Sequence, residues 1–128
     1  MPTTATIIID AANVVGSTPD GWWRDRQGAT RRLRDRLDHL ARHGLPHWRQ
    51  QPPLTVLLVT EGKARGLTST DTVTVVAAPG SGDDTIVDLV TDHAHNPVMV
   101  ITSDRRLRQR AADAGAETLP VSALPVPQ

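Results

Sequence analysis

The sequence has no cysteine, no phenylalanine and no tyrosine, and its only lysine is Lys63. Without cysteine, neither a disulfide framework nor a thiolate zinc site can form. Without phenylalanine and tyrosine, the chain has no aromatic sheet platform of the kind that many single-strand RNA-binding domains use. Base stacking is therefore limited to its three tryptophans, its arginines and its histidines.

Long apolar runs are also missing from the sequence. No stretch reaches the length needed to span a membrane, and the N-terminus lacks the basic start and apolar core of a signal peptide. We therefore expect a cytoplasmic protein with no membrane partner. A length of 128 residues predicts one domain that occupies residues 1–128.

Neither sign of charge is in excess, because 14 Lys and Arg residues balance 14 Asp and Glu residues. The arginines are nevertheless clustered, in the stretches 24–36 and 105–110. Each cluster fits a surface that faces phosphates and equally fits an ordinary solvated surface in an arginine-rich protein.

Continuous apolar runs predict strands over residues 6–10, 54–60, 72–77, 98–102 and 116–119. Helical patterns occupy residues 29–43, the stretch from Asp83 to the Asn96-Pro97 break, and the stretch after Asp104. Residues 16–28 form a long polar connection between the first strand and the first of these helices. Apolar strands that alternate with helices are typical of a mostly parallel sheet covered on both faces. The sequence therefore predicts a three-layer α/β fold with a central sheet of about five strands.

Acidic residues stand where the predicted strands end. Asp10 closes the first strand, Glu61 follows the second and Asp104 follows the fourth, while Asp83 and Asp84 begin a helix. The carboxyl ends of parallel strands share one edge of a sheet, which is where such folds bind ligands. Carboxylates gathered there repel one another unless a cation neutralises them, and oxygen ligands suit Mg²⁺ or Mn²⁺. Such ions can activate water for attack on a phosphodiester.

Most of these acids also have a structural interpretation. Asp83 and Asp104 could each cap a helix, and Glu61 could be a solvated loop acid. Asn13 could simply stabilise a turn. Asp10 is harder to explain in this way, because nothing at the end of a buried strand requires an ionised carboxylate. The expected convergence of the acids on one edge favours a site.

Three segments resemble the NYN group of PIN-like ribonucleases, and in particular its YacP-like branch. They are residues 8–16 (IIDAANVVG), 81–86 (SGDDTI) and 100–104 (VITSD), and together they cover nearly the whole chain. In that family an acid ends the first strand and an asparagine follows three residues later, which matches Asp10 and Asn13. An acid begins the helix before the fourth strand, which matches Asp83, and Thr/Ser-Ser-Asp ends that strand, as in 102–104. Glu61-Gly62 resembles the family's acid-glycine pair with Glu in place of Asp.

The resemblance implies a PIN-like fold and an Mg²⁺- or Mn²⁺-dependent ribonuclease acting on RNA. Asp10, Asp83 and Asp104 would hold the metal and act in catalysis, and Asp84 and Glu61 would assist as ligands. Asn13 would belong to the catalytic set, and with Ser103 it would orient a ligand or a metal-bound water.

The insert at residues 19–26 (PDGWWRDR) departs from the general family pattern and resembles segments of compact actinobacterial versions of the domain. Because it follows the first strand, Trp22 or Trp23 could stack a base while Arg24 or Arg26 holds a phosphate. One tryptophan could instead fill the core, so we expect one to point inward and one to lie at the site rim. Further candidates for gripping the RNA backbone are Arg31 and Arg105.

Other functions stay open at this stage. A nucleotide (pyro)phosphohydrolase would use the same acids, and a non-catalytic RNA- or protein-binding module would keep only the fold. A homodimer and a toxin role with an antitoxin-like partner are also compatible with the chain. His39 and His43 have a spacing that can chelate a transition metal, but the sequence offers no third convergent ligand.

Overall fold

The computed structural model describes residues 4–18, 21–64 and 66–125, so Pro19 and Asp20 of the insert lie outside the described residues. Its centre is a sheet of five parallel strands in the order β3-β2-β1-β4-β5. This confirms the predicted α/β class with a parallel central sheet. The strands are β1 (Thr6–Asp10), β2 (Thr55–Thr60), β3 (Val73–Ala77), β4 (Val98–Ile101) and β5 (Glu117–Leu119).

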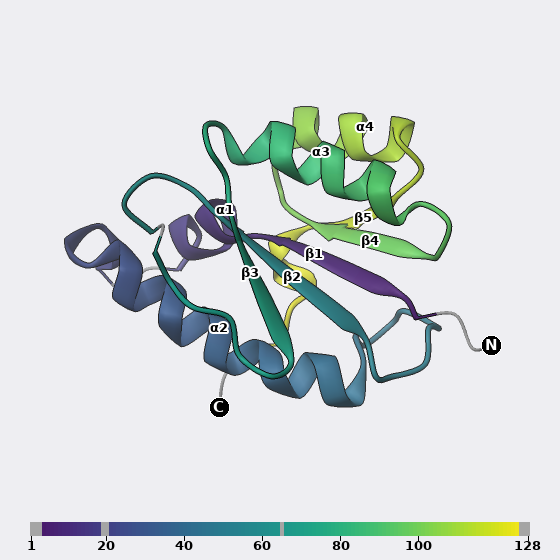
Figure 1. Ribbon diagram of the computed structural model, residues 1–128, viewed down its shortest axis with the longest axis horizontal. Coiled ribbons are helices and arrows are strands. Elements are labelled where there is room, and N and C mark those ends of the chain that lie inside the picture. The colour runs from purple at the N-terminus through teal and green to yellow at the C-terminus, as the bar shows by residue number, and fades with distance from the viewer. Residues whose placement is uncertain (1–3, 19–20, 65, 126–128) are drawn as a thin grey trace.

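Helices cover both faces of this sheet, as Figure 1 shows: α2 lies below the strands in that view, and α3 and α4 lie above them. No helix in the described part of the chain is long and apolar enough to cross a membrane. The α-helices are α1 (Ala11–Gly16), α2 (Arg26–His43), α3 (Gly82–His93) and α4 (Arg105–Asp113), and the short 3-10 helices are η1 (Trp22–Arg24), η2 (Gly62–Ala64) and η3 (Val121–Ala123).

Two apolar cores lie on the two faces of the sheet, and β1 contributes to both. Ile7 and Ile9 pack with α1 and α2, whereas Ile8 packs with α3 and α4. All three isoleucines are fully buried. Successive side chains of a strand point to opposite faces, so a strand buried on both sides must be apolar throughout. This physical requirement is what made β1 recognisable in the sequence.

The connection after β1 is more helical than the sequence predicts. Residues 16–28 were predicted to be a long polar connection, but η1 forms within them at Trp22, and α1, which precedes them from Ala11, was not predicted. A six-residue helix that carries Val14 and Val15 has little intrinsic propensity, so its sequence gives no helical signal.

Helix α2 begins at Arg26, three residues before the predicted start. The reason is a cap, because Oδ1 of Asp25 accepts a hydrogen bond from the backbone N–H of Gly28 at 2.9 Å. The predicted end of this helix is confirmed, since Gly44 occupies the C-cap with a φ of 91° and donates to the carbonyl of Leu40.

Trp48 ties the segment after α2 to the edge strand β5. Its ring is buried in the core on the α2 face, and its indole N–H donates to Oε2 of Glu117 at 2.9 Å. A buried indole needs such a partner, because an unpaired N–H would lose its bond to water. This contact joins residues far apart in the sequence and holds β5, the short strand at one edge of the sheet.

Replacing Trp48 with Phe keeps much of the apolar bulk and removes the donor. We expect the free energy of unfolding to fall by about 1–3 kcal/mol, measured by urea denaturation. Glu117→Gln retains an acceptor, so it should lower the free energy of unfolding less than Glu117→Ala does. Equal stability of Glu117→Ala and the unmodified protein would contradict a stabilising role for this hydrogen bond.

Candidate functional site

Asp10 is the last residue of β1 and its carboxylate is buried, with 8% of the residue exposed. It lies on the same face of the strand as Ile8, toward α3 and α4. Two donors orient it: the hydroxyl of Thr102 donates to Oδ2 at 2.9 Å, and the backbone N–H of Asn13 donates to Oδ1 at 3.4 Å. The second contact makes Asp10 the N-cap of α1, so the expectation that nothing at the end of this strand uses the carboxylate structurally was wrong. No ion pair to Asp10 occurs within the described ranges.

Thr102 links two of the expected site residues. It follows β4, it is fully buried, and its Oγ1 both donates to Asp10 and accepts from the backbone N–H of Asp104 at 3.2 Å. The hydroxyl therefore connects the end of β1 to the turn between β4 and α4. Thr102 was not among the predicted site residues, although its place immediately after a buried apolar strand was a usable signal.

Asp104 does cap α4, as one interpretation of the sequence proposed. Its Oδ1 accepts from the backbone N–H of Leu107 at 3.1 Å. The residue is otherwise exposed to solvent, at the same end of the sheet as Asp10. A cap uses one carboxylate oxygen, so this role is compatible with a second one.

Asp83 is not the cap of α3, and the structural interpretation of this residue was wrong. The N-cap is Ser81, whose Oγ accepts from the backbone N–H of Asp83 at 3.2 Å. The pKa of Asp83 is raised, first by burial and then by the negative charges of Asp104 and Glu61, while Arg110 opposes the shift. Asp83 therefore faces other carboxylates at the start of α3.

Glu61 is not a solvated loop acid either. It follows β2, is partly buried, and its Oε2 accepts from the backbone N–H of Gly82 at 2.5 Å. A Cβ at position 82 would lie 2.6 Å from that oxygen, so an alanine there would force the end of the Glu61 side chain to move. Gly82 is a second residue that sequence reasoning missed, because its role depends on a tertiary contact.

The pKa of Asp10 is also raised. Burial is the main cause, the hydrogen bonds from Thr102 and Asn13 oppose it, and the charges of Asp83 and Glu61 add to it. The structure therefore brings Asp83 and Glu61 within electrostatic reach of Asp10, and Asp104 and Glu61 within reach of Asp83. These are the acids that the sequence placed at one sheet edge.

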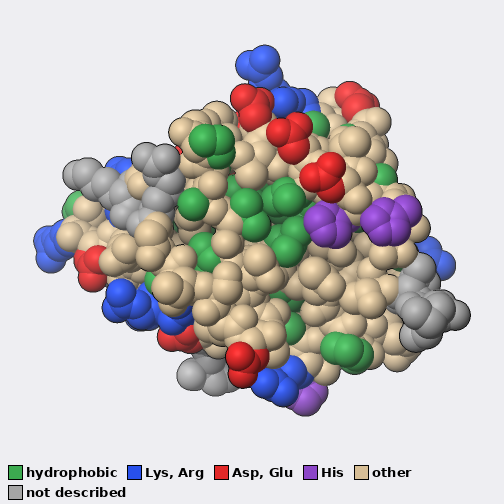
Figure 2. All heavy atoms as spheres, in the orientation of Figure 1, with side chains coloured by type: hydrophobic (Ala, Val, Ile, Leu, Met, Phe, Trp, Pro, Cys, Tyr) green, Lys and Arg blue, Asp and Glu red, His purple; other side chains and the backbone are tan. Residues whose placement is uncertain are grey.

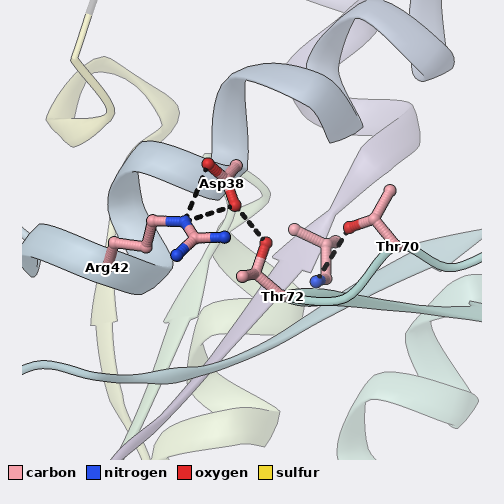
Figure 3. A network of polar contacts seen from close by, with 5 residues as sticks. Asp38, Arg42, Thr70 and Thr72 are labelled. Atoms are coloured by element: carbon pink, nitrogen blue, oxygen red, sulfur yellow. Dashed lines mark hydrogen bonds and ion pairs between the residues drawn. The ribbon is translucent and has the colours of Figure 1, made fainter.

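Asp38 on α2 shows how a carboxylate with structural partners behaves in this protein. It accepts from the hydroxyl of Thr72 at 2.6 Å and from Nε of Arg42 at 3.0 Å, as Figure 3 shows. These hydrogen bonds lower the pKa of Asp38. The pKa values of Asp10 and Asp83 shift in the opposite direction, because burial and nearby negative charges disfavour the ionised form of these two carboxylates.

The donor set fits a hard divalent cation in its chemistry, because it consists of carboxylate oxygens whose charges repel. Among residues 4–18, 21–64 and 66–125, however, no three acidic or histidine side chains form a group that could hold a metal ion. The acids would therefore have to move closer together to bind one ion jointly. His39 and His43 stack at 4.4 Å between ring centroids and gain no third ligand in this part of the chain.

Three predicted site residues are engaged in other contacts. Asp84 pairs with Nη2 of Arg110 at 2.9 Å, and its side chain is 74% exposed. Oδ1 of Asn13 accepts from the backbone N–H of Ser103 at 2.8 Å, which fastens α1 to the β4–α4 turn. Oγ of Ser103 accepts from the backbone N–H of Val121 at 3.0 Å. These oxygens serve the local structure.

One of the two adjacent tryptophans packs inward, as expected, while the place of the other at the rim of the site stays a prediction. Trp22 packs against the core on the α2 face, and Trp23 is 59% exposed. The arginines predicted to bind substrate are all exposed, and they are Arg24, Arg26, Arg31 and Arg105.

No family model and no curated protein sequence matches the chain. Its structure is nevertheless similar to crystal structures of Rae1 (YacP) from Bacillus subtilis. The chain has the YacP fold. One structure, of a point mutant of Rae1, matches with a TM-score of 0.72 and 15% identity over 94% of this chain and 72% of that chain. Another structure of Rae1 matches with a TM-score of 0.65 and 14% identity over 92% and 70%. The fold that the sequence resemblance implied is therefore confirmed.

Gly82→Ala tests the contact between Glu61 and α3. Alanine normally stabilises a helix relative to glycine, but here its Cβ must displace Oε2 of Glu61. We expect urea denaturation to show a loss of about 1–3 kcal/mol in the free energy of unfolding. Gly80→Ala is the matched control, because a Cβ there meets nothing within 4 Å. A stable Gly82→Ala protein would show that the contact does not constrain α3.

Asp10→Asn should stabilise the protein at neutral pH when EDTA removes divalent ions. The pKa of Asp10 is higher in the folded chain than its usual 3.8, so ionisation costs the folded state more than the unfolded one. This cost is absent below pH 3.8, grows as pH rises through the raised pKa, and persists above it. The variant's advantage in thermal midpoint should therefore be larger at about pH 8 than near pH 4. An advantage that shrinks as pH rises would contradict this assignment.

Proposed function

We propose that the protein is an Mg²⁺- or Mn²⁺-dependent ribonuclease whose cleavage site is the carboxyl edge of the sheet around Asp10. One observation carries the proposal: a buried carboxylate at the end of the most enclosed strand faces further acids and has a raised pKa. Acids whose pKa is raised by burial and by like charge are candidates for functional sites. The YacP fold supports a nuclease-like function.

The arrangement costs stability, which is the reason to assign it a role. Asp10 and Asp83 are held near other negative charges, and the structural network around Asp38 shows that this chain can pair an acid with partners. Local features that work against stability are expected where function requires them. A cation bound between these acids would remove most of the repulsion.

Asp10, Asp83 and Asp104 would hold the ion, with Glu61 and Asp84 assisting. When bound, Mg²⁺ or Mn²⁺ would lower the pKa of a water molecule and stabilise the charge that develops on the phosphodiester. Glu61 also holds the start of α3 through Gly82, so it positions Asp83. Asp84 receives a lesser role because Arg110 already neutralises it.

The protein's other residues would position these acids and the substrate. Thr102 orients Asp10 and fixes the backbone of Asp104. Asn13 holds the backbone of Ser103 in the same turn, which keeps α1 against the site. Arg105 begins α4 next to Asp104 and is exposed, so it can contact a backbone phosphate, and Arg31 can do so further along α2.

Two other functions use the same fold. A nucleotide (pyro)phosphohydrolase would need the same acids and differ only in substrate. A non-catalytic RNA-binding module is favoured by one observation, the lack of a three-residue metal-holding group in the described part of the chain. The substrate that is consumed and the requirement for a metal distinguish the ribonuclease, the nucleotide hydrolase and the binding module.

Cleavage of structured and single-stranded RNAs with Mg²⁺, Mn²⁺ or EDTA tests the proposal directly. Asp10→Asn and Asp83→Asn should each lower the rate at least about 100-fold, because loss of even an outer-shell partner of a metal costs about 10- to 100-fold. Asp92→Asn is the control, since Asp92 is an exposed acid near the other end of α3. Retained cleavage in Asp10→Asn would mean that the site is assigned wrongly.

Nucleoside triphosphates and dinucleotides offered in the same reactions separate the two enzymatic functions. If the nucleotides are consumed while the RNA stays intact, the protein is a nucleotide hydrolase and not a ribonuclease. Metal-independent RNA binding without any turnover, unchanged in Asp10→Asn, would favour the binding module.

Metal binding can be measured without turnover. A ligand that binds only the folded protein raises stability by about 2.7 kcal/mol at 100 times its dissociation constant. We therefore expect Mn²⁺ to raise the thermal midpoint of the unmodified protein and of Asp92→Asn, and to have little effect on Asp10→Asn. An equal Mn²⁺ effect in all three would place the ion elsewhere.

A further inference from the structure

We propose that η1 is a stacking platform on which Trp23 holds an unpaired base of single-stranded RNA while Arg24 and Arg26 attract its phosphates. The inference deepens the proposed function, on which it rests for the identity of the polymer. It assigns a binding subsite to the insert that separates this chain from the general family pattern.

The exposed indole is the first element of the argument. Trp23 is the only large apolar side chain that is exposed in the described ranges, at 59%. Trp22 stands against it edge to face, with ring centroids 6.0 Å apart and an interplanar angle of 86°. Because Trp22 packs on the core, it anchors the position of its neighbour. A fixed indole with an accessible surface can stack a base at small entropic cost.

Two arginine side chains lie close to the pair of tryptophans. The guanidinium carbon of Arg24 lies 5.9 Å from the ring centroid of Trp23, and that of Arg26 lies 5.3 Å from the centroid of Trp22. Cation–π contacts of this length hold the guanidinium group of Arg24 over the ring of Trp23 and that of Arg26 over the ring of Trp22. The carboxylate of Asp25, between them in the sequence, caps α2 through Gly28. An aromatic ring flanked by guanidinium groups is the combination that binds single strands without base preference.

The platform lies at the same end of the sheet as the acids. Helix α1 starts directly after Asp10 and leads to η1, and α2 contacts both η1 and η2, which follows Glu61. In Figure 2, Lys and Arg side chains gather at the left, where Figure 1 places the first turns of α2. A strand cleaved near Asp10 could therefore extend across α1 toward Trp23.

A single-stranded nucleic acid fits this surface better than a membrane or a protein. Bilayer docking needs a contiguous apolar surface and the core of a protein interface is depleted of charged residues, whereas the one large apolar side chain exposed in the described ranges has exposed arginines next to it. Double-stranded RNA hides the faces of its bases within the stack, so it cannot use the ring. The chemistry therefore selects an unpaired base next to phosphates.

Binding of single-stranded oligoribonucleotides in EDTA tests the inference, with fluorescence anisotropy as the readout. EDTA and an Asp10→Asn background remove cleavage, so the result does not depend on whether the protein is a nuclease. Base stacking on an aromatic side chain is worth about 1–3 kcal/mol, which is about 5- to 150-fold in affinity. We expect Trp23→Leu to weaken single-strand binding within that range and Trp23→Phe to retain most of it.

A duplex of the same length is the substrate control, and its weaker binding should be unchanged in Trp23→Leu. Arg24→Gln should weaken binding and reduce its salt dependence. Arg49→Gln, which removes an exposed arginine beyond the C-terminal end of α2, should do neither. Circular dichroism would confirm that each variant is folded.

Three results would overturn the inference. They are unchanged single-strand binding in Trp23→Leu, an equal loss for duplex and single strand, and a blue shift of tryptophan emission with vesicles of anionic lipid that RNA does not produce. Single-strand binding that needs Trp23 in a protein without any cleavage would uphold the platform and refute the ribonuclease.

Discussion

The carboxylate of Asp10 is buried at the end of β1, between β2 and β4, and the geometry of the site follows from how it is held. Ile7, Ile8 and Ile9 are fully buried on both faces of the sheet, which fixes β1 as its central strand. The register sets Asp10 beside Val59 of β2, and the chain that leaves β4 brings Thr102 within 2.9 Å of it. An acid in this place cannot turn toward bulk solvent, so its charge must be balanced locally.

The neighbouring acids make structural hydrogen bonds in addition to their proposed role as metal ligands, and these hydrogen bonds explain how the acids come together. Glu61 holds Gly82, and so fastens the start of α3 to the end of β2. Asp104 caps α4 and is itself fixed by Thr102. Each backbone N–H that donates such a bond offsets part of the charge of the carboxylate without removing the acid from the site. Structural roles and a metal-binding role are therefore not exclusive alternatives for these residues.

Much of the fold could be predicted from the sequence, because strands buried on both faces must be continuously apolar, and their predicted ends agree with the structure to within a residue. Helix α1 could not, since Val14 and Val15 give it no propensity and the cap from Asp10 is what starts it. The candidate acids could be listed from strand ends, and the cap at Ser81 is a local contact, but the role of Gly82 depends on a tertiary contact with Glu61. Which of Trp22 and Trp23 points inward depends likewise on how η1 packs.

The carboxyl edge has two chemically different sides, and the sheet keeps them apart. Asp10 and Thr102 face the layer of α3 and α4, whereas Trp22 packs in the layer of α2 with Trp23 outside it. The acidic side also carries arginines, because α4 begins with Arg105 and Arg110 pairs with Asp84. Helix α1, which begins at Asp10, connects this side to the tryptophans. A polyanion could therefore meet positive charge on both sides of the edge and negative charge only where an ion can mediate the contact.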